Sequence, residues 1–225
     1  MELSIDTSTR FASVGLSTQG QVSATMTWRS QQNHSVELVP AIMALMERVG
    51  VRRPQLDAVF VAVGPGGFSA LRVGISTAKA MAVALDLPVV SVGTLDIEAH
   101  PYLGLGFPVC ALIEAGRERV YRGRYEVGDS KPLSEVVAVD DLGPDVESTL
   151  YCGEAVSALA GVLSERLGHG ARIVDVPPPT RSLSVLAEMA YGKLVRGDTA
   201  DRETLQPTYL RSAQVNTADR TWSRD

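Results

Sequence analysis

Apolar and polar residues alternate strictly near the start of the chain. After a turn signal at Gln19-Gly20, the apolar positions of this alternation are Val22, Ala24, Met26 and Trp28. A period of two is typical of a strand with one face on a core. Two apolar segments precede it, Leu3–Ile5 and Phe11–Ser17, and short polar turns join them. The pattern predicts three consecutive antiparallel strands.

Helical and continuous apolar patterns follow. Ser35–Val49 and Ser69–Leu85 have the periodicity of helices. Asp57–Val63 and Pro88–Val92 are nearly all apolar and rich in valine, as expected of strands that are covered on both faces. With a short helix over Thr94–His100, the predicted order of the first hundred residues is βββαβαβα.

The second half repeats strands followed by helices with a weaker pattern. Gly104–Pro108 is typical of a junction, so we predict one lobe over residues 1–103 and another over residues 104–225. The elements predicted beyond the junction are strands over 109–113, 120–127 and 135–139, a helix over 155–167, a strand over 173–176 and a helix over 182–196.

The two long helices carry more apolar surface than one core contact requires. On the first, one stripe contains Leu38, Ile42, Leu45 and Val49, and a neighbouring stripe contains Val36, Val39, Met43 and Met46. Together they span roughly twice the arc that a helix buries against one sheet. Both helices could be covered within the chain, but we favour an interface with another protein. The residues predicted for it are Leu38, Ile42, Leu45, Met46, Val49, Leu71, Gly74, Ile75, Ala78, Ala82 and Leu85.

Composition limits the classes of function. The chain has 225 residues, of which 45% are hydrophobic and 21% charged, with a net charge of −5. Without a run of Lys and Arg it is a poor unaided binder of RNA, because phosphate contacts supply most of that affinity. No uncharged apolar segment is long enough to span a membrane, and no leader is recognisable, so we expect a cytoplasmic protein. Cys110 and Cys152 are expected to be buried thiols.

Two polar turns follow predicted strands and are candidates for chemistry. They are Asp6, Thr7, Ser8 and Thr9 in the first turn, and Gly64, Gly66 and Gly67 in the second. A carboxylate with hydroxyls can hold a metal and phosphate, and glycines before a helix let backbone N–H groups approach an anion. The alternative for the first turn is an Asx or Ser/Thr turn that uses the same side chains for backbone hydrogen bonds. Such turns suit an actin-like ATPase fold.

No complete catalytic or metal site is recognisable in the sequence. His34, His100 and His169 are not spaced as metal ligands, so no metal site is predicted. His34, at a helix start, is expected to cap or pack. There is no Walker motif and no nucleophile elbow. We therefore predict no catalytic residue in this chain.

Several segments together resemble the TsaB (YeaZ) family. They are Ile5–Thr9, His34-Ser35 with Leu38–Pro40, Val63–Gly74, Ala78–Ala80, Val92–Asp96 and Pro207–Arg211. The resemblance covers most of residues 1–100 and is patchy beyond them. Gly67–Ala70 departs from the usual SFTG of that family, and Ile113–Arg117 departs from its IDAR segment.

The resemblance implies an α/β fold of the actin/Hsp70-like (ribonuclease H-like) ATPase type, with two lobes that each contain a mixed sheet and helices. It implies a scaffold subunit that pairs with the transferase TsaD in threonylcarbamoylation of N6 of the tRNA adenosine beside the anticodon. A third subunit, the ATPase TsaE, is expected, with ATP and metal on these partners and tRNA contacted only indirectly. A homodimer is expected when the partner is absent. The alternative is an ATP-dependent small-molecule kinase of the actin-like superfamily.

Overall fold

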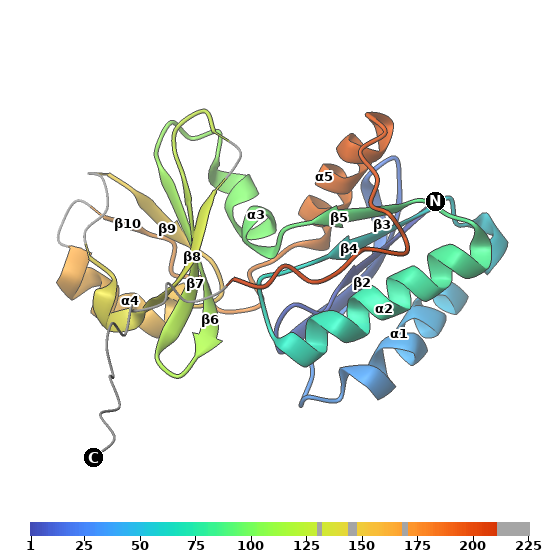
Figure 1. Ribbon diagram of the computed structural model, residues 1–225, viewed down its shortest axis with the longest axis horizontal. Coiled ribbons are helices and arrows are strands. Elements are labelled where there is room, and N and C mark those ends of the chain that lie inside the picture. Colours follow the sequence, from blue (N-terminus) through green and yellow to red (C-terminus); the bar gives the residue numbers. More distant parts are fainter. Residues whose placement is uncertain (130–131, 144–147, 168–170, 211–225) are drawn as a thin grey trace, which may run out of the picture.

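Two five-stranded mixed sheets organise the chain (Figure 1). The computed structural model describes residues 1–129, 132–143, 148–167 and 171–210. The first sheet has the order β3-β2-β1-β4-β5. Its strands are β1 (Glu2–Asp6), β2 (Phe11–Thr18), β3 (Gln21–Arg29), β4 (Ala58–Ala62) and β5 (Val89–Val92).

The second sheet repeats the architecture of the first. Its strands are β6 (Val109–Gly116), β7 (Arg119–Tyr125), β8 (Leu133–Ala138), β9 (Leu150–Cys152) and β10 (Arg172–Ile173). In the order β8-β7-β6-β9-β10 the pairings are antiparallel, antiparallel, parallel and parallel, as they are in the first sheet. The repetition predicted from the sequence is confirmed.

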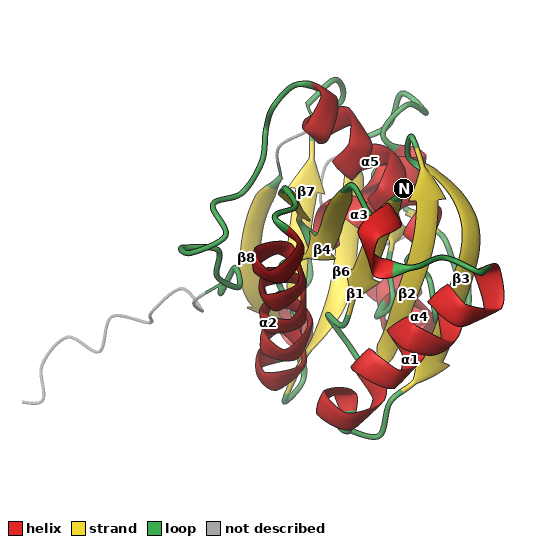
Figure 2. Cartoon of the chain, turned by 90° about the vertical axis from the view of Figure 1, so that its right-hand side faces the viewer, coloured by secondary structure: helices red, strands yellow, loops and turns green. Residues whose placement is uncertain are grey.

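Helices cover both faces of the first sheet. Helices α1 (His34–Val49) and α2 (Phe68–Leu85) lie side by side on one face, as Figures 1 and 2 both show. Leu38, Leu45 and Leu71 pack there against the sheet. Helix α5 (Leu183–Val195) packs on the opposite face, against Phe60 and its neighbours. The division predicted at residue 104 assigns α5 to the second lobe by sequence, whereas in space it belongs to the first sheet.

Two further helices complete the described elements. Helix α3 (Thr94–Ala99) follows β5, continues as the 3₁₀ turn η2 (His100–Tyr102) and contacts β6 and β7 of the second sheet. Helix α4 (Val156–Leu167) lies between β9 and β10 in sequence, as α2 lies between β4 and β5. The remaining 3₁₀ turns are η1 (Arg53–Gln55) and η3 (Val139–Asp141).

Most predicted elements are confirmed within a few residues, with two exceptions. Strand β9 (Leu150–Cys152) was not predicted, because three residues carry too little pattern. The strand predicted over 173–176 is only the pair Arg172–Ile173, and a Pro-rich connection follows it. Both cysteines are buried, as expected. His169 and Arg211, which the sequence analysis singled out, lie outside the described residues.

The chain returns to the first lobe near its end. Residues 199–210, called the C-terminal strap here, run past α2 (Figure 1). Lys79 of α2 donates from Nζ to the carbonyl oxygens of Glu203 (2.8 Å) and Leu205 (3.3 Å). The Thr208 amide donates to the Val63 carbonyl over 2.7 Å. The strap is therefore hydrogen-bonded to α2 and to the loop that precedes it.

Helix α2 is long and apolar enough, by length and composition, to cross a membrane. Core helices of globular proteins pass the same test. One stripe of α2, including Leu71, Ile75 and Ala78, is buried against the first sheet. Its apolar composition is thus used in packing on one side, while Ala80, Val83 and Ala84 on other sides of the helix are exposed.

Candidate functional site: interlobe cleft and helical groove

The two polar turns that were predicted as phosphate loops are adjacent in the structure, and they pack directly against each other. The amide of Gly67 donates to the Ser8 carbonyl over 2.8 Å. A Cβ added to Gly66 would lie only 2.1 Å from the same carbonyl oxygen. The hydroxyl of Thr94 donates to Ser8 Oγ over 2.9 Å. The second turn therefore rests on the first, and its glycines serve this close approach.

Internal hydrogen bonds use the polar side chains of the first turn. Asp6 Oδ1 accepts from the Ser8 amide over 2.8 Å, which is the Asx turn considered from the sequence. Thr7 donates to the Ala70 carbonyl over 2.7 Å, and Thr9 donates to Glu154 Oε2 over 2.7 Å. The polar side chains of this turn are therefore used in hydrogen bonds within the turn itself, to α2 and to the second lobe.

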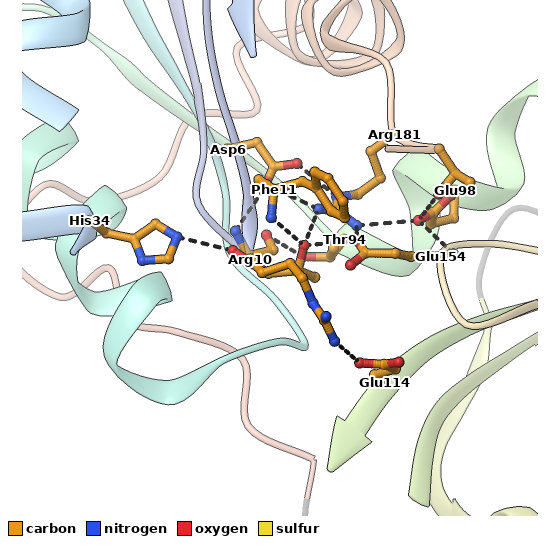
Figure 3. A network of polar contacts seen from close by, with 12 residues as sticks. Asp6, Arg10, Phe11, His34, Thr94, Glu98, Glu114, Glu154 and Arg181 are labelled. Atoms are coloured by element: carbon orange, nitrogen blue, oxygen red, sulfur yellow. Dashed lines mark hydrogen bonds and ion pairs between the residues drawn. The ribbon is translucent and has the colours of Figure 1, made fainter. Parts of the chain in front are cut away.

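Arg181 lies between the two lobes, next to Asp6, Glu98 and Glu154 (Figure 3). Its Nε donates to Asp6 Oδ2 over 2.8 Å, and its Nη1 donates to Glu154 (2.6 Å) and Glu98 (3.3 Å). Its Nη2 donates to Thr9 Oγ1 (2.7 Å) and to the Phe11 carbonyl (3.4 Å). The five N–H bonds of a guanidinium are thereby all engaged. Its side chain is only 4% exposed.

The charged groups of this cluster shift one another's pKa values. Burial alone would lower the pKa of Arg181, but the carboxylates of Asp6, Glu98 and Glu154 outweigh burial and raise it. Burial raises the pKa of Glu98, against the lowering effects of Arg181 and of the Thr180 hydrogen bond. Arg181 therefore stays charged, and its carboxylates are committed to it.

His34 joins this cluster to helix α1. Its Nε2 lies 3.0 Å from the Thr9 carbonyl, and its Nδ1 lies 3.4 Å from Ser30 Oγ. Because a carbonyl only accepts, Nε2 carries the proton. The predicted packing role of His34 is confirmed, since the residue is buried.

A pocket of about 480 Å³ lies at the mouth of the cleft. It is lined from the first lobe by residues that include Thr9, His34 and Phe68, and from the second by Glu114 and Glu154. Arg10 spans this mouth and pairs with Glu114. The Tyr121 hydroxyl donates to the Gly66 carbonyl over 3.3 Å. Polar contacts thus join the two lobes at the mouth as well as around Arg181.

A second, apolar depression lies between α1 and α2 on the outer surface. This helical groove has a volume of about 510 Å³. Its lining residues are Val39, Ile42, Met43, Met46, Arg53, Ser76, Thr77, Ala80, Met81, Ala84 and Leu85. Met43 is 52% exposed and Val39 48% exposed. Val36 of α1 and Val83 of α2 are also exposed, at 69% and 64%, but neither lines the groove.

The structure confirms an excess of apolar surface on the two helices but corrects the residues. Leu38, Leu45, Leu71, Gly74, Ile75, Ala78 and Ala82 are buried, most of them against the first sheet. They cannot meet a partner in the folded chain. Ile42, Met46 and Leu85 reach the floor of the groove, and Val49 is partly exposed at the end of α1. The accessible face is the neighbouring stripe with Val39 and Met43.

Sequence and structure comparisons identify the relatives of this arrangement. A family model described as TsaD, tRNA N6-adenosine threonylcarbamoyltransferase, matches residues 28–142, just over half of the chain. The TsaB protein of Bacillus subtilis is 28% identical over 95% of both chains. The structure of YeaZ from Pseudomonas aeruginosa is 25% identical with a TM-score of 0.72, covering 93% of this chain and 99% of that one. The chain belongs to the TsaB (YeaZ) family.

The fold also extends beyond the TsaB family. The activator of 2-hydroxyisocaproyl-CoA dehydratase from Clostridium difficile is 9% identical with a TM-score of 0.51, over 92% of this chain and 98% of that one. This likeness concerns the fold alone, and it supports the expected two-lobed actin-like architecture.

The sequence did not indicate a role for Arg181, because its ion-pair partner Asp6 lies 175 positions away in the chain.

Proposed function

We propose that this chain is a non-catalytic subunit of tRNA threonylcarbamoyladenosine biosynthesis that binds a TsaD-type transferase through its helical groove. The observation that carries the proposal is the exposed apolar surface of the groove between α1 and α2, including Val39, Met43 and Ala84. A contiguous apolar surface of this kind marks an interaction site in a folded protein. Its relatives carry names from this pathway.

A transferase of the TsaD type suits the groove because it is a relative of this chain. The matched residues, 28–142, include both α1 and α2. A transferase with the equivalent helices could place its own pair against this one, so that two apolar pairs cover each other in a helical bundle. By the same argument, a second copy of this chain would cover the groove when the transferase is absent, giving a homodimer.

Catalysis is assigned to the partners because the buried carboxylates between the lobes of this chain are engaged by its own Arg181. Asp6, Glu98 and Glu154 all pair with Arg181, so their charges are already engaged within the chain, including that of Glu154, which also lines the pocket at the cleft mouth. We place ATP and metal on the other subunits and assign the TsaE-type ATPase to the same complex. With a net charge of −5 the chain contacts tRNA only through its partners. Its location is then the cytoplasm, where such a complex meets tRNA.

Substitution within the groove tests the interface. Met43→Asp and Ala80→Asp place a charge on exposed groove positions, so the monomer should stay folded. Burying that charge against an apolar partner is costly, and co-purification with the transferase should be lost. Val195→Asp is the matched control, since Val195 is 68% exposed at the end of α5 on the other face of the sheet. If both groove variants still co-purify, the interface assignment is wrong.

Charged substitutions at buried positions of α1 and α2 would not test the interface. Leu45 is 2% exposed and Ala78 is 0% exposed, so a charged side chain at either position would disrupt the core. Loss of binding by such a variant would report unfolding. The groove variants avoid this ambiguity.

The cellular function has its own measurement. tRNA from cells in which Met43→Asp replaces the wild-type chain should lack threonylcarbamoyladenosine, while the Val195→Asp cells should retain it. The kinase alternative requires nucleotide binding by the isolated chain. Calorimetry with Mg-ATP should show no binding, because Arg181 already engages the buried carboxylates between the lobes. Micromolar binding together with normal tRNA modification in the Met43→Asp cells would favour the kinase.

A further inference from the structure

The cluster around Arg181 connects parts of the chain that no single element joins. Asp6 ends β1 of the first lobe, and Glu154 follows β9 of the second. Glu98 lies on α3, and Arg181 lies in the segment that leads to α5. The guanidinium contacts all three carboxylates within 3.3 Å. It therefore fastens both lobes to each other from inside the cleft (Figure 3).

Both helices of the groove begin on the turn that Arg181 holds. The Thr9 carbonyl accepts from His34, the first residue of α1, over 3.0 Å. The Ser8 carbonyl accepts from the amide of Gly67, the residue before α2, over 2.8 Å. Thr7 donates to the carbonyl of Ala70 in the first turn of α2 over 2.7 Å. Three consecutive residues thus fix the starts of α1 and α2.

Arg181 binds this turn at both ends. Nε pairs with the Asp6 carboxylate and Nη2 donates to the Thr9 hydroxyl. The Thr9 hydroxyl in turn donates to Glu154 of the second lobe over 2.7 Å. Removing the guanidinium would leave three carboxylates in a buried space without their cation, and the turn would lose its support.

We infer that Arg181 is a positioning residue for the partner-binding face, because it holds the Asp6–Thr9 turn on which α1 and α2 are seated and sets the groove relative to the second lobe. The inference rests on the proposed function, since it takes the groove as the partner site. It assigns the interlobe cluster to the geometry of a protein interface. The side chain acts through the turn and touches neither helix face.

The first test measures affinity of the full chain for the TsaD-type transferase. Arg181→Ala should weaken binding at least tenfold, and added methylguanidinium should restore it by replacing the lost cation. Methylammonium at the same concentration should restore less, because it lacks the planar set of N–H donors. The matched control is Arg122→Ala, which removes a largely buried arginine that pairs with Glu135 within the second sheet. It should leave the affinity within twofold.

The second test measures amide hydrogen exchange and does not depend on the partner. Thr9→Val keeps the shape of the side chain and removes the hydroxyl that links Arg181 to Glu154. Exchange should quicken at Gly67 and in the first turns of α1 and α2, while β7 should be unchanged. If Arg181→Ala does not fold, hydrogen exchange of the Thr9→Val variant tests the role of Arg181 in its place.

Both tests have outcomes that would contradict the role inferred for Arg181. A folded Arg181→Ala chain with wild-type affinity would overturn the inference, as would unchanged exchange at Gly67 in Thr9→Val. Weakened binding that methylguanidinium does not restore would also contradict it, because general destabilisation would then explain the loss. If Met43→Asp binds like the wild type, the proposed interface fails. The role of Arg181 would then be judged on hydrogen exchange alone.

Discussion

The close contact between Gly66 and Ser8 gives a sharp test of whether the two polar turns are packed together. Gly66→Ala would place a Cβ 2.1 Å from the Ser8 carbonyl oxygen. The two atoms must separate by about 1 Å or more, and the neighbouring atom is backbone, which cannot rotate away. The hydrogen bond from the Gly67 amide to the same oxygen would be strained or lost.

The expected cost follows from these contacts. Overpacking contributes about 1–3 kcal/mol, and loss of the hydrogen bond contributes about 1 kcal/mol. Alanine restricts the unfolded chain, which offsets about 0.4–1 kcal/mol. Gly66→Ala should therefore reduce the free energy of unfolding by about 1–3.5 kcal/mol. For a chain of this size Tm should fall by roughly 2–14 °C.

The neighbouring position provides the control. A Cβ on Gly67 would meet the Ala70 Cβ at 3.6 Å, an ordinary contact, and the backbone φ of −65° suits alanine. Gly67→Ala should change the stability by less than about 1 kcal/mol. Urea and thermal unfolding of both variants measure the difference. Equal stability of the two variants would show that the two turns do not pack against each other.

Three further changes probe other parts of the chain. Glu98 has a raised pKa because of its burial, so its charge reduces stability as pH rises above the ordinary carboxyl range. Glu98→Gln should therefore gain stability relative to the wild type between pH 5 and pH 8, as measured by urea unfolding at each pH. Lys79→Met removes the donor to the Leu205 carbonyl, so amide exchange should quicken in the C-terminal strap with little change in Tm. Ser182→Ala removes the cap that accepts from the Ser184 amide, and stability should fall by about 1 kcal/mol in thermal unfolding.

The strands and helices of the first lobe could be predicted because their patterns are long and regular. The alternation of β3 extends over nine residues, and α1 and α2 have 16 and 18 residues. Short elements carry no such signal. Strand β9 has three residues and β10 has two, and both are defined by pairing with neighbours distant in sequence. Their existence depends on the second sheet as a whole.

Periodicity showed that the helices have too much apolar surface, but it could not show which side faces the sheet. The stripes with Leu38 and Leu45 and with Val39 and Met43 are similarly apolar. Only the packing of α1 on β2 and β3 buries the first and exposes the second. A hydrophobic residue on a helix can serve the core or a partner equally well, so the choice needs the tertiary structure.

Arg181 was beyond prediction for a different reason. An isolated arginine after the Pro177–Pro179 segment has no local partner, and surface positions are the usual place for arginine. Its burial becomes favourable only when three carboxylates from three other segments surround it. The Asx turn at Asp6 was open to prediction because its donor, Ser8, lies two residues away.

The packing of the two turns also explains why loops that suit phosphate binding can serve a structural role. Helix α2 meets the first turn over its first two turns: Gly67 donates to Ser8, Ala70 accepts from Thr7, and a Cβ on Gly74 would lie 2.3 Å from Thr7 Oγ1. Small residues are needed at these contacts whether or not a nucleotide binds. The composition of the loops is therefore no measure of nucleotide binding. It follows equally from the need to hold α2 close to the end of β1.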